Sequence, residues 1–403
     1  MSNDVHTDPP GTAARRAALR LLDAVLRKGL PLESALDTAA RELDRADDRA
    51  FAHAIAAEAL RRLTDLDELI DHATRKRLPD DAKARSALRI ALVQALAMGT
   101  PHHAAISTVL PLVDGGPRKL VHGVFSAVMR EKWQLPEVPN LPAGVVERWR
   151  AAWGPEAVEA AARLMATPPP LDLFGEPPAG VDGVSLMPGH LRVARGTGVA
   201  GLAGYGDGKW WVQDVSAAIP ARLLGAGDGR TALDLCAAPG GKTMQLALAG
   251  WDVTAVDVSP SRLARLSENL ARTGLPAAVV AADVMTWAPP APVDAVLLDA
   301  PCSATGIYRR HPDVLHRIRP RAIRELAEVQ KAMLLRVADW VKPGGTLVYA
   351  VCSLEPEEGE KVADALLARR DDYVLGERQR ILPGTWEAQG GADSFFIARF
   401  VRK

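Results

Sequence analysis

Two cysteines in the carboxy-terminal half of the chain each follow a short apolar run. Cys302 comes after Val296-Leu297-Leu298, and Cys352 comes after Thr346–Tyr349. Such runs predict buried parallel strands, and ligands of parallel sheets bind outside the carboxyl ends of the strands. Asp299 stands at the end of the first run, in Asp299-Ala300-Pro301-Cys302-Ser303. We therefore expect two thiols and an acid on the working edge of one sheet, a combination that suggests covalent catalysis.

The sheet that must position these groups is predicted from the pattern after about residue 220, where strands alternate with helices. The predicted strands are Ala232–Leu235, Val253–Val256, Ala278–Ala281, Ala295–Leu298 and Thr346–Val351. The predicted helices are Lys242–Ala249, Pro260–Thr273, Arg321–Trp340 and Pro356–Ala368. A terminal pair around Tyr373–Leu375 and Phe395–Val401 is expected to add an antiparallel edge.

Residues from about 12 to 135 follow a helical pattern instead. Ala18, Leu21, Leu22, Val25 and Leu26 have the spacing of one apolar helix face. Further helices are predicted around 52–63, 84–98, 104–113 and 120–131, with Gly115-Gly116-Pro117 as a breaker between the last two. The intervening part is rich in proline and predicts a linker helix at about 145–166 and a small α+β module. We expect a multidomain chain divided at 1–137, 138–220 and 221–403.

The bulk composition narrows the class of protein. The chain has 403 residues, a formal net charge of zero and three cysteines. An odd number of cysteines without close pairing favours reduced thiols in the cytoplasm. The polar start Met1-Ser2-Asn3-Asp4 predicts no signal peptide, and no apolar run has the length of a membrane span. We expect a cytoplasmic, monomeric protein without a membrane partner, and histidine pairs without cysteine or carboxylate ligands at metal spacing predict no metal.

The first strand of the predicted sheet leads into a glycine-containing loop, Asp234-Leu235-Cys236-Ala237-Ala238-Pro239-Gly240-Gly241-Lys242-Thr243. A Walker A phosphate loop is excluded because Cys236 stands where that motif needs glycine, and the loop is no dinucleotide G-x-G-x-x-G either. Asp257 follows about twenty residues later, where an acid can bind ribose hydroxyls. Asp283 ends the third strand within reach of an adenine amino group. These acids favour S-adenosylmethionine over NAD or ATP, although each Asp could instead cap the next helix.

Three of these stretches carry a family resemblance. Cys236–Lys242, Asp299–Gly306 and Tyr349–Ser353 together resemble the RNA 5-methylcytosine methyltransferases, in particular the bacterial 16S ribosomal RNA family called RsmB, Fmu or Sun. The stretch Arg309–Asp313 extends the likeness, and the helical first domain resembles the RNA-binding factor NusB. The chain departs from the family at Val351, where Thr is usual, at Ser126, where Asn is common, and in a short middle module in which Leu171–Phe174 occupies the place of an Arg-x-Asn element.

The resemblance implies a fold and a set of roles. It implies an all-α NusB-like domain, a small α+β module and a Rossmann-like, class I methyltransferase domain. Cys352 would attack carbon 6 of cytosine, Asp299 would activate ring nitrogen 3, and Cys302 would assist release. Without the resemblance the order of the thiols stays open, because DNA cytosine methyltransferases use the Pro-Cys thiol, here Cys302. The cofactor-binding residues are then Cys236, Ala237, Ala238, Pro239, Gly240, Gly241, Lys242, Asp257, Arg262, Asp283 and Asp299.

Within this set, Cys236 is read as a small buried side chain without chemistry of its own. Lys242 opens a helix near the expected cofactor carboxylate, where a cation and backbone N–H groups favour an anion. Arg262 is expected to pair with Asp257.

A basic segment follows the first catalytic cysteine. It contains Arg309, Arg310, His311, His316 and Arg317, and it predicts contacts with RNA phosphates beside the pocket, with a solvated helix face as the simpler alternative. We therefore expect an S-adenosylmethionine-dependent RNA cytosine-5 methyltransferase acting on 16S ribosomal RNA. One alternative is a transfer-RNA cytosine-5 methyltransferase. The other is a non-catalytic RNA-binding assembly factor, and the two intact thiols argue against this second alternative.

Overall fold

The computed structural model describes residues 8–403, and its contacts divide the chain into two units. The helical unit contains Met1–Arg148 together with Arg310–Ile318, and the sheet unit contains Trp149–Arg309 together with Arg319–Lys403. The polar start Met1-Ser2-Asn3-Asp4 lies outside the described residues. Within residues 8–403, every helix is too short or too polar to pass through a bilayer.

Within the described residues, the helical unit contains helices from the amino-terminal part of the chain and one short helix from later in the sequence. These are α1 (Thr12–Leu26), α2 (Leu32–Ala39), α3 (Ala46–Arg61), α4 (Leu63–Ala73), α5 (Lys83–Leu96), α6 (His102–Ser107), α7 (Gly115–Arg130) and α12 (Val314–Arg317). The apolar face predicted for α1 is confirmed, because Leu21, Leu22 and Val25 are fully buried in the unit's core. The sequence pattern did not predict α2 and α4.

The predicted breaker Gly115-Gly116-Pro117 does not separate two helices in the way expected. These residues form the first turn of α7, and the break falls before them, at Asp114. Proline is tolerated in the first helical turn because the N–H that it lacks has no intrahelical acceptor there. The breaker therefore marks the start of a helix.

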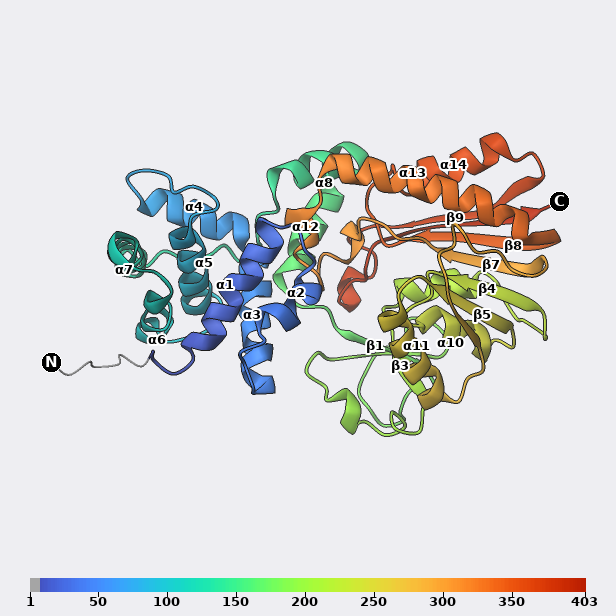
Figure 1. Ribbon diagram of the computed structural model, residues 1–403, viewed down its shortest axis with the longest axis horizontal. Coiled ribbons are helices and arrows are strands. Elements are labelled where there is room, and N and C mark those ends of the chain that lie inside the picture. The colour runs from blue at the N-terminus through green and yellow to red at the C-terminus, as the bar shows by residue number, and fades with distance from the viewer. Residues whose placement is uncertain (1–7) are drawn as a thin grey trace. The chain divides into compact units, whose positions relative to one another are not determined.

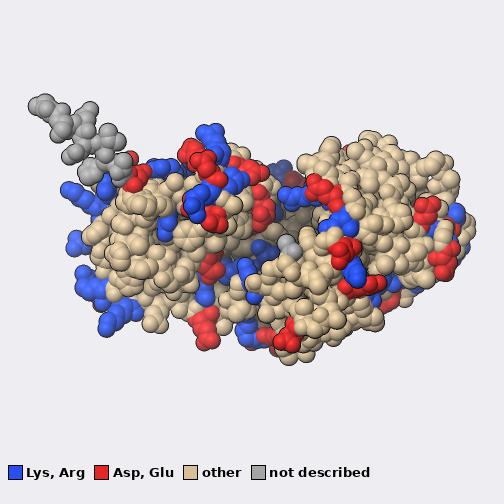
Figure 2. Space-filling model, turned by 90° about the horizontal axis from the view of Figure 1, so that it is seen from below, with Lys and Arg blue, Asp and Glu red and all other residues tan. Residues whose placement is uncertain are grey.

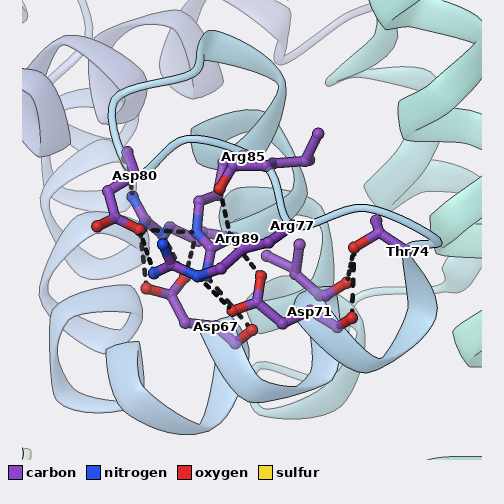
Figure 3. A network of polar contacts seen from close by, with 9 residues as sticks. Asp67, Asp71, Thr74, Arg77, Asp80, Arg85 and Arg89 are labelled. Atoms are coloured by element: carbon purple, nitrogen blue, oxygen red, sulfur yellow. Dashed lines mark hydrogen bonds and ion pairs between the residues drawn. The ribbon is translucent and has the colours of Figure 1, made fainter.

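A buried network of ion pairs joins α4 to α5 in the helical unit (Figure 3). Arg89 donates from Nε and Nη2 to the two carboxylate oxygens of Asp67, at 2.7 and 2.8 Å. Arg85 reaches Asp67 at 3.1 Å and Asp71 at 2.5 Å. Both arginine side chains are buried, so their charges are balanced mainly by these two aspartates.

The sheet unit is organised around seven strands in the order β6-β5-β4-β7-β8-β10-β9. Their bounds are β4 (Thr231–Leu235), β5 (Asp252–Asp257), β6 (Ala278–Ala281), β7 (Val293–Asp299), β8 (Val341–Val351), β9 (Tyr373–Ile381) and β10 (Phe395–Arg402). The first five are parallel, and β10 pairs antiparallel with β8 and β9. The predicted Rossmann-like sheet with its antiparallel edge is confirmed.

Helices cover both faces of this sheet (Figure 1). On one side lie α13 (Pro320–Val337) and α14 (Glu360–Arg369), and on the other α10 (Gly241–Leu248) and α11 (Pro260–Thr273). The strand residues Val296–Leu298 and Leu347–Tyr349 are fully buried between these layers. This burial on both faces explains why the two strands read as continuous apolar runs.

The middle of the chain forms a long helix and a small sheet. Helix α8 spans Ala143–Ala166 and is interrupted at Gly154, where φ is 83° before Pro155. The small sheet has the order β2-β1-β3, with β1 at Leu171–Gly175, β2 at His190–Val193 and β3 at Trp210–Val212. The sequence pattern did not predict β1, which occupies the place of the family's Arg-x-Asn element. The α+β character predicted for this part is confirmed.

Candidate active site

The two thiols lie side by side at the carboxyl edge of the sheet. β7 and β8 are parallel neighbours, with Asp299 opposite Ala350 as their last pair. Cys302 lies three residues beyond this pair on one chain segment and Cys352 two residues beyond it on the other. Their Sγ atoms are 3.5 Å apart, and both side chains are partly buried. The prediction that both cysteines reach the same edge of the sheet is thus confirmed.

The surroundings of Cys302 disfavour loss of its proton. The hydrogen bond to Cys352, and then burial, hold the pKa of the Cys302 thiol well above its usual value. Two thiolates at this separation would repel each other, so the pair carries at most one negative charge at neutral pH. The raised pKa of Cys302 favours its protonated, thiol form.

Asp299 forms an ion pair with Lys242 beside the thiols. Lys242, near the start of α10, donates from Nζ to Oδ2 of Asp299 at 2.7 Å. Burial would lower the pKa of Lys242, but the charge and hydrogen bond of Asp299 outweigh it and leave the pKa raised. The ammonium therefore stays charged at the edge of the sheet. The sequence placed Lys242 near a cofactor carboxylate and did not predict its pairing with Asp299.

The glycine loop is tied to the end of the next strand. The backbone N–H of Ala238 donates to Oδ2 of Asp257 at 3.2 Å, and Arg262 Nη1 lies 3.4 Å from the same oxygen. The expected pairing of Arg262 with Asp257 is confirmed, and Arg262 also donates to the carbonyl of Ala238. A Cβ atom on Gly240 would lie 2.9 Å from the Leu266 side chain. Glycine is needed there, where φ is 105°.

A cavity of about 380 Å³ opens between this loop, β3 and α10. Its walls include loop residues Ala237–Pro239, the Lys242–Asp299 pair, and the aromatic rings of Tyr205 and Trp211. Asp257 is not among the residues that line this cavity, but it binds the backbone N–H of Ala238 in the loop. Asp283 is exposed, lies two residues after β6 and accepts a hydrogen bond from its own turn at Met285. Ala237–Pro239, Gly241, Lys242 and Asp299 thus line this cavity and Asp283 does not, although the N–H of the preceding Ala282 donates to the Asp257 carbonyl at 3.1 Å.

One residue that the sequence did not single out lies in this wall. Asp234, at the end of β4, is fully buried and accepts a hydrogen bond from Thr243 on Oδ2 at 2.6 Å. Burial raises its pKa to about 7, and its Oδ1 has no hydrogen-bond partner within the described part of the chain. A buried acceptor facing a cavity suits a ligand with an amino donor. An acid within an otherwise apolar strand was the signal available in the sequence.

The basic segment after Cys302 differs from the sequence prediction. Arg309 is only 1% exposed and donates to the carbonyls of Leu164 and Gly390, so it is not available to an RNA phosphate. His316 is partly buried, and burial lowers its pKa to about 4, so the ring is neutral at pH 7. Arg317 is paired with Asp313 at 2.8 Å. The prediction of an RNA contact is therefore wrong for Arg309.

Arg310 and His311 are partly exposed, and burial lowers the pKa of His311. With Arg317 they remain predictions as RNA contacts. They belong to the segment Arg310–Ile318, which packs within the helical unit, where the His316 ring contacts the Leu60 carbonyl at 2.7 Å. Figure 2 shows Lys and Arg side chains gathered at the left edge of the view, over the helical unit, whereas elsewhere on that face both signs are interspersed.

Among residues 8–403, no group of three or more His, Cys, Asp and Glu side chains could hold a metal ion.

Comparison with known proteins adds independent findings. Residues 221–401 match the family described as 16S rRNA methyltransferase RsmB/F, and residues 12–130 match the NusB family. A ribosomal RNA small subunit methyltransferase B from Klebsiella pneumoniae is 32% identical over 431 residues, with 96% of this chain and 98% of the relative covered. One from Xylella fastidiosa is 34% identical, with 97% and 98% covered.

Solved structures support the fold. The crystal structure of a protein called PH0851 aligns with a TM-score of 0.73 at 22% identity, covering 98% of this chain and 99% of that one. A methyltransferase homologue from Pyrococcus horikoshii aligns with a TM-score of 0.56 at 22% identity, covering 69% of this chain and 98% of that one.

Proposed function

Because the chain belongs to the RsmB/F family of 16S rRNA methyltransferases, we propose that it forms 5-methylcytosine in 16S rRNA through a covalent bond between Cys352 and the base. Membership of this family shows that the protein is an S-adenosylmethionine-dependent rRNA methyltransferase. The observation that supports the finer proposal best is the pair of thiols 3.5 Å apart beside the Lys242–Asp299 ion pair.

The residues that line the cavity are suited to bind S-adenosylmethionine. The loop Ala237–Gly241 allows close approach to its backbone, and the Asp234 Oδ1 atom and Lys242 offer an acceptor and a cation for the amino and carboxylate groups of a methionine moiety. When bound, S-adenosylmethionine supplies the electrophilic methyl group that carbon 5 receives. Glycines, a buried acceptor and aromatic rings together make these residues suited to hold it.

Cys352 begins the reaction in this proposal. Its thiolate forms a bond to carbon 6 of cytosine, and the electron pair of the 5,6 double bond moves to make carbon 5 nucleophilic. The attack is assisted if ring nitrogen 3 receives a proton. We assign this proton to the carboxyl of Asp299, which takes it up from solvent and is held in place by the Lys242 ammonium at 2.7 Å.

Cys302 ends the reaction. After methylation, carbon 5 carries both a methyl group and a hydrogen. The Cys302 sulfur takes that proton as a thiolate, the electron pair restores the 5,6 double bond, and the bond between Cys352 and carbon 6 breaks. For this step Cys302 must first release its own proton to solvent, which is easier once Cys352 is bonded to carbon and no longer carries charge. Ring nitrogen 3 returns its proton to Asp299, and Cys352 leaves as a thiolate.

The two single cysteine variants test this assignment. Cys302→Ala should accumulate a protein–RNA adduct that survives a denaturing gel, and Cys352→Ala should form none and lose methyl transfer. An adduct with Cys352→Ala and none with Cys302→Ala would reverse the roles. Absence of an adduct in both, with methyl transfer retained, would contradict covalent catalysis.

The substrate is tested in cells. Bisulfite sequencing of RNA from a deletion strain should show a 5-methylcytosine lost from 16S rRNA. A loss from transfer RNA alone would favour the alternative enzyme, and no loss in any RNA would favour a non-catalytic assembly factor.

Three further features complete the proposal. The target base must leave its stack to reach a thiol, so the substrate is single-stranded or locally opened RNA. We place the reaction in the cytoplasm, as the three free cysteines favour, and expect a monomer by light scattering. We also retain the division at 1–137, 138–220 and 221–403 as a functional one, with the NusB-like part binding RNA.

A further inference from the structure

A single buried carboxylate touches both segments that carry the catalytic thiols. Glu358 lies six residues after Cys352 and is fully buried. Its Oε1 accepts the backbone N–H of Ser303 at 2.8 Å, and its Oε2 accepts the Ser303 hydroxyl at 2.5 Å. The same Oε2 accepts the Ser353 hydroxyl, also at 2.5 Å.

These two serines directly follow the two thiols. Ser303 is the neighbour of Cys302 and Ser353 is the neighbour of Cys352. The paired positions of β7 and β8 end at Asp299 and Ala350, so the regular ladder does not extend to either cysteine. The separation of the two sulfurs therefore depends on contacts beyond the strands, and Glu358 makes three of them.

Neutral groups complete the surroundings of this carboxylate. Gln330 of α13 donates from Nε2 to Oε1 of Glu358 at 3.0 Å and to the carbonyl of Pro301 at 2.9 Å. The Tyr349 hydroxyl donates to the backbone carbonyl of Glu358 at 2.5 Å. Every hydrogen-bond donor that the residues from 8 onward supply to Glu358 is uncharged. A buried carboxylate without a cation costs stability, which suggests that its placement serves something other than stability.

We propose that Glu358 is a positioning residue that bridges Ser303 and Ser353 and thereby holds the Cys302 and Cys352 sulfurs at the separation that the methyl-transfer cycle needs. The catalytic meaning of this bridge rests on the proposed function, whereas the bridge itself is a property of the folded protein. In this bridge, Oε1 of Glu358 accepts the N–H groups of Ser303 and Gln330. Its Oε2 accepts the hydroxyls of Ser303 and Ser353.

Glutamine can satisfy the same geometry. Its amide oxygen can accept from Ser303 N–H and Gln330, while its NH₂ group donates to the two serine hydroxyls, which rotate to accept. Alanine removes all of these contacts. The pair Glu358→Gln and Glu358→Ala therefore separates a bridging role from a role of the negative charge.

Thiol crosslinking measures the bridge without methyl transfer. Diamide oxidises two neighbouring thiols to a disulfide, and peptide mapping of the full-length protein identifies the linked pair. We expect Cys302–Cys352 crosslinking at the parental rate in Glu358→Gln and at least about tenfold slower in Glu358→Ala, because effective concentration depends steeply on orientation. Glu357→Ala is the matched control, since Glu357 pairs with Lys361 at 2.9 Å and should crosslink like the parent.

Turnover gives the second measurement. Glu358→Ala should lower kcat by about 10²-fold with little change in KM for RNA, the loss typical of a displaced reacting group. Glu358→Gln should stay within about fivefold of the parent, because only the charge of the hydrogen bonds changes. Equal loss of turnover in both variants would show that the charge, not the bridge, matters, and would overturn the proposal.

A second route to the same contacts guards against misfolding. Ser303→Ala combined with Ser353→Ala removes both hydroxyls and keeps Glu358, so it should slow crosslinking in the same direction as Glu358→Ala. Parental crosslinking rates in folded Glu358→Ala and in the double serine variant would also overturn the proposal. If Glu358→Ala crosslinks slowly but the parent protein does not methylate cytosine, the proposed function is refuted and the bridging role of Glu358 remains supported.

Discussion

The two units each contain a buried polar network built around carboxylates, and the networks differ in their partners. In the helical unit, Asp67 and Asp71 meet the guanidinium groups of Arg85 and Arg89 (Figure 3). In the sheet unit, the donors that the described residues offer to Glu358 are hydroxyl and amide groups. The hydrogen bond from Arg85 lowers the pKa of Asp71, whereas burial raises the pKa of Glu358.

The difference separates two uses of buried polarity. Arginine and aspartate neutralise each other, so the first network stabilises helix packing in a permanently charged form. The second network keeps an unbalanced acid, and its hydrogen bonds fix the backbone beside two reactive thiols. We infer that the helical network is structural and that the sheet network trades stability for the geometry of the site.

The largest effect on stability should come from removing a buried cation. Arg85→Met deprives Asp67 and Asp71 of a shared partner, and breaking such a pair typically costs 3–5 kcal/mol. Because both acids keep some contact with water, we expect about 3 kcal/mol, the low end of that range. Urea unfolding measures it.

The control is Arg77→Met, which removes an arginine of the same cluster that is 62% exposed and should change stability by less than about 1 kcal/mol. Equal costs for both variants would show that burial does not set the strength of this network.

The same conservative change in each network should have unequal effects. Asp67→Asn removes the charge from a carboxylate that accepts both Nε and Nη2 of Arg89, and we expect a cost of about 2 kcal/mol. Glu358→Gln removes the charge from an acid without a cation, so we expect a change of less than about 1 kcal/mol. Thermal and urea unfolding of the two variants compare them directly. A larger cost for Glu358→Gln would contradict the comparison.

The smallest effect, and the most diagnostic, is on pH dependence. A raised folded pKa means that the stabilising contribution of Glu358 is complete below its ordinary value of 4.5 and is lost as pH rises through the raised pKa. A lowered pKa means that the contribution of Asp71 is present above its ordinary value of 3.8 and is lost as pH falls through the lowered pKa.

Relative to the parent, Glu358→Gln should therefore gain stability as pH rises above 4.5, and Asp71→Asn should lose stability as pH rises toward 3.8. Unfolding free energies measured across both windows give the two slopes. Slopes of the same sign would break the distinction between the networks.

Much of the sheet unit could be predicted from sequence. The strands β4, β5, β7 and β8 lay near where the patterns placed them, because parallel strands buried on both faces are largely apolar. The helix Pro260–Thr273 and the antiparallel edge were also predicted. In the helical unit, α2 and α4 were missed. Helix α2 has only eight residues, too few for a clear helical period. Helix α4 follows α3 after a single residue, Arg62, so no loop signal separated the two in the sequence.

The basic segment shows why local composition was not enough for the site. Arg309, Arg310 and Arg317 look alike in the sequence, yet the first is buried against two carbonyls and the last is paired with Asp313. The sequence around an arginine in a loop does not show whether its side chain will bind water, a phosphate or a backbone oxygen. The carbonyls that bind Arg309 belong to residues 164 and 390, which are distant along the chain.

By itself the sequence determined the family, the parallel sheet and the presence of Asp299, Cys302 and Cys352 at its working edge. These follow from short-range patterns, since a strand's end and the residues just after it are adjacent along the chain. The tertiary structure decided what those groups touch: the 3.5 Å between the thiols, the pairing of Lys242 with Asp299, and the bridge from Glu358. Each joins residues that only folding brings together, because burial and hydrogen bonding depend on surroundings assembled from distant parts of the chain.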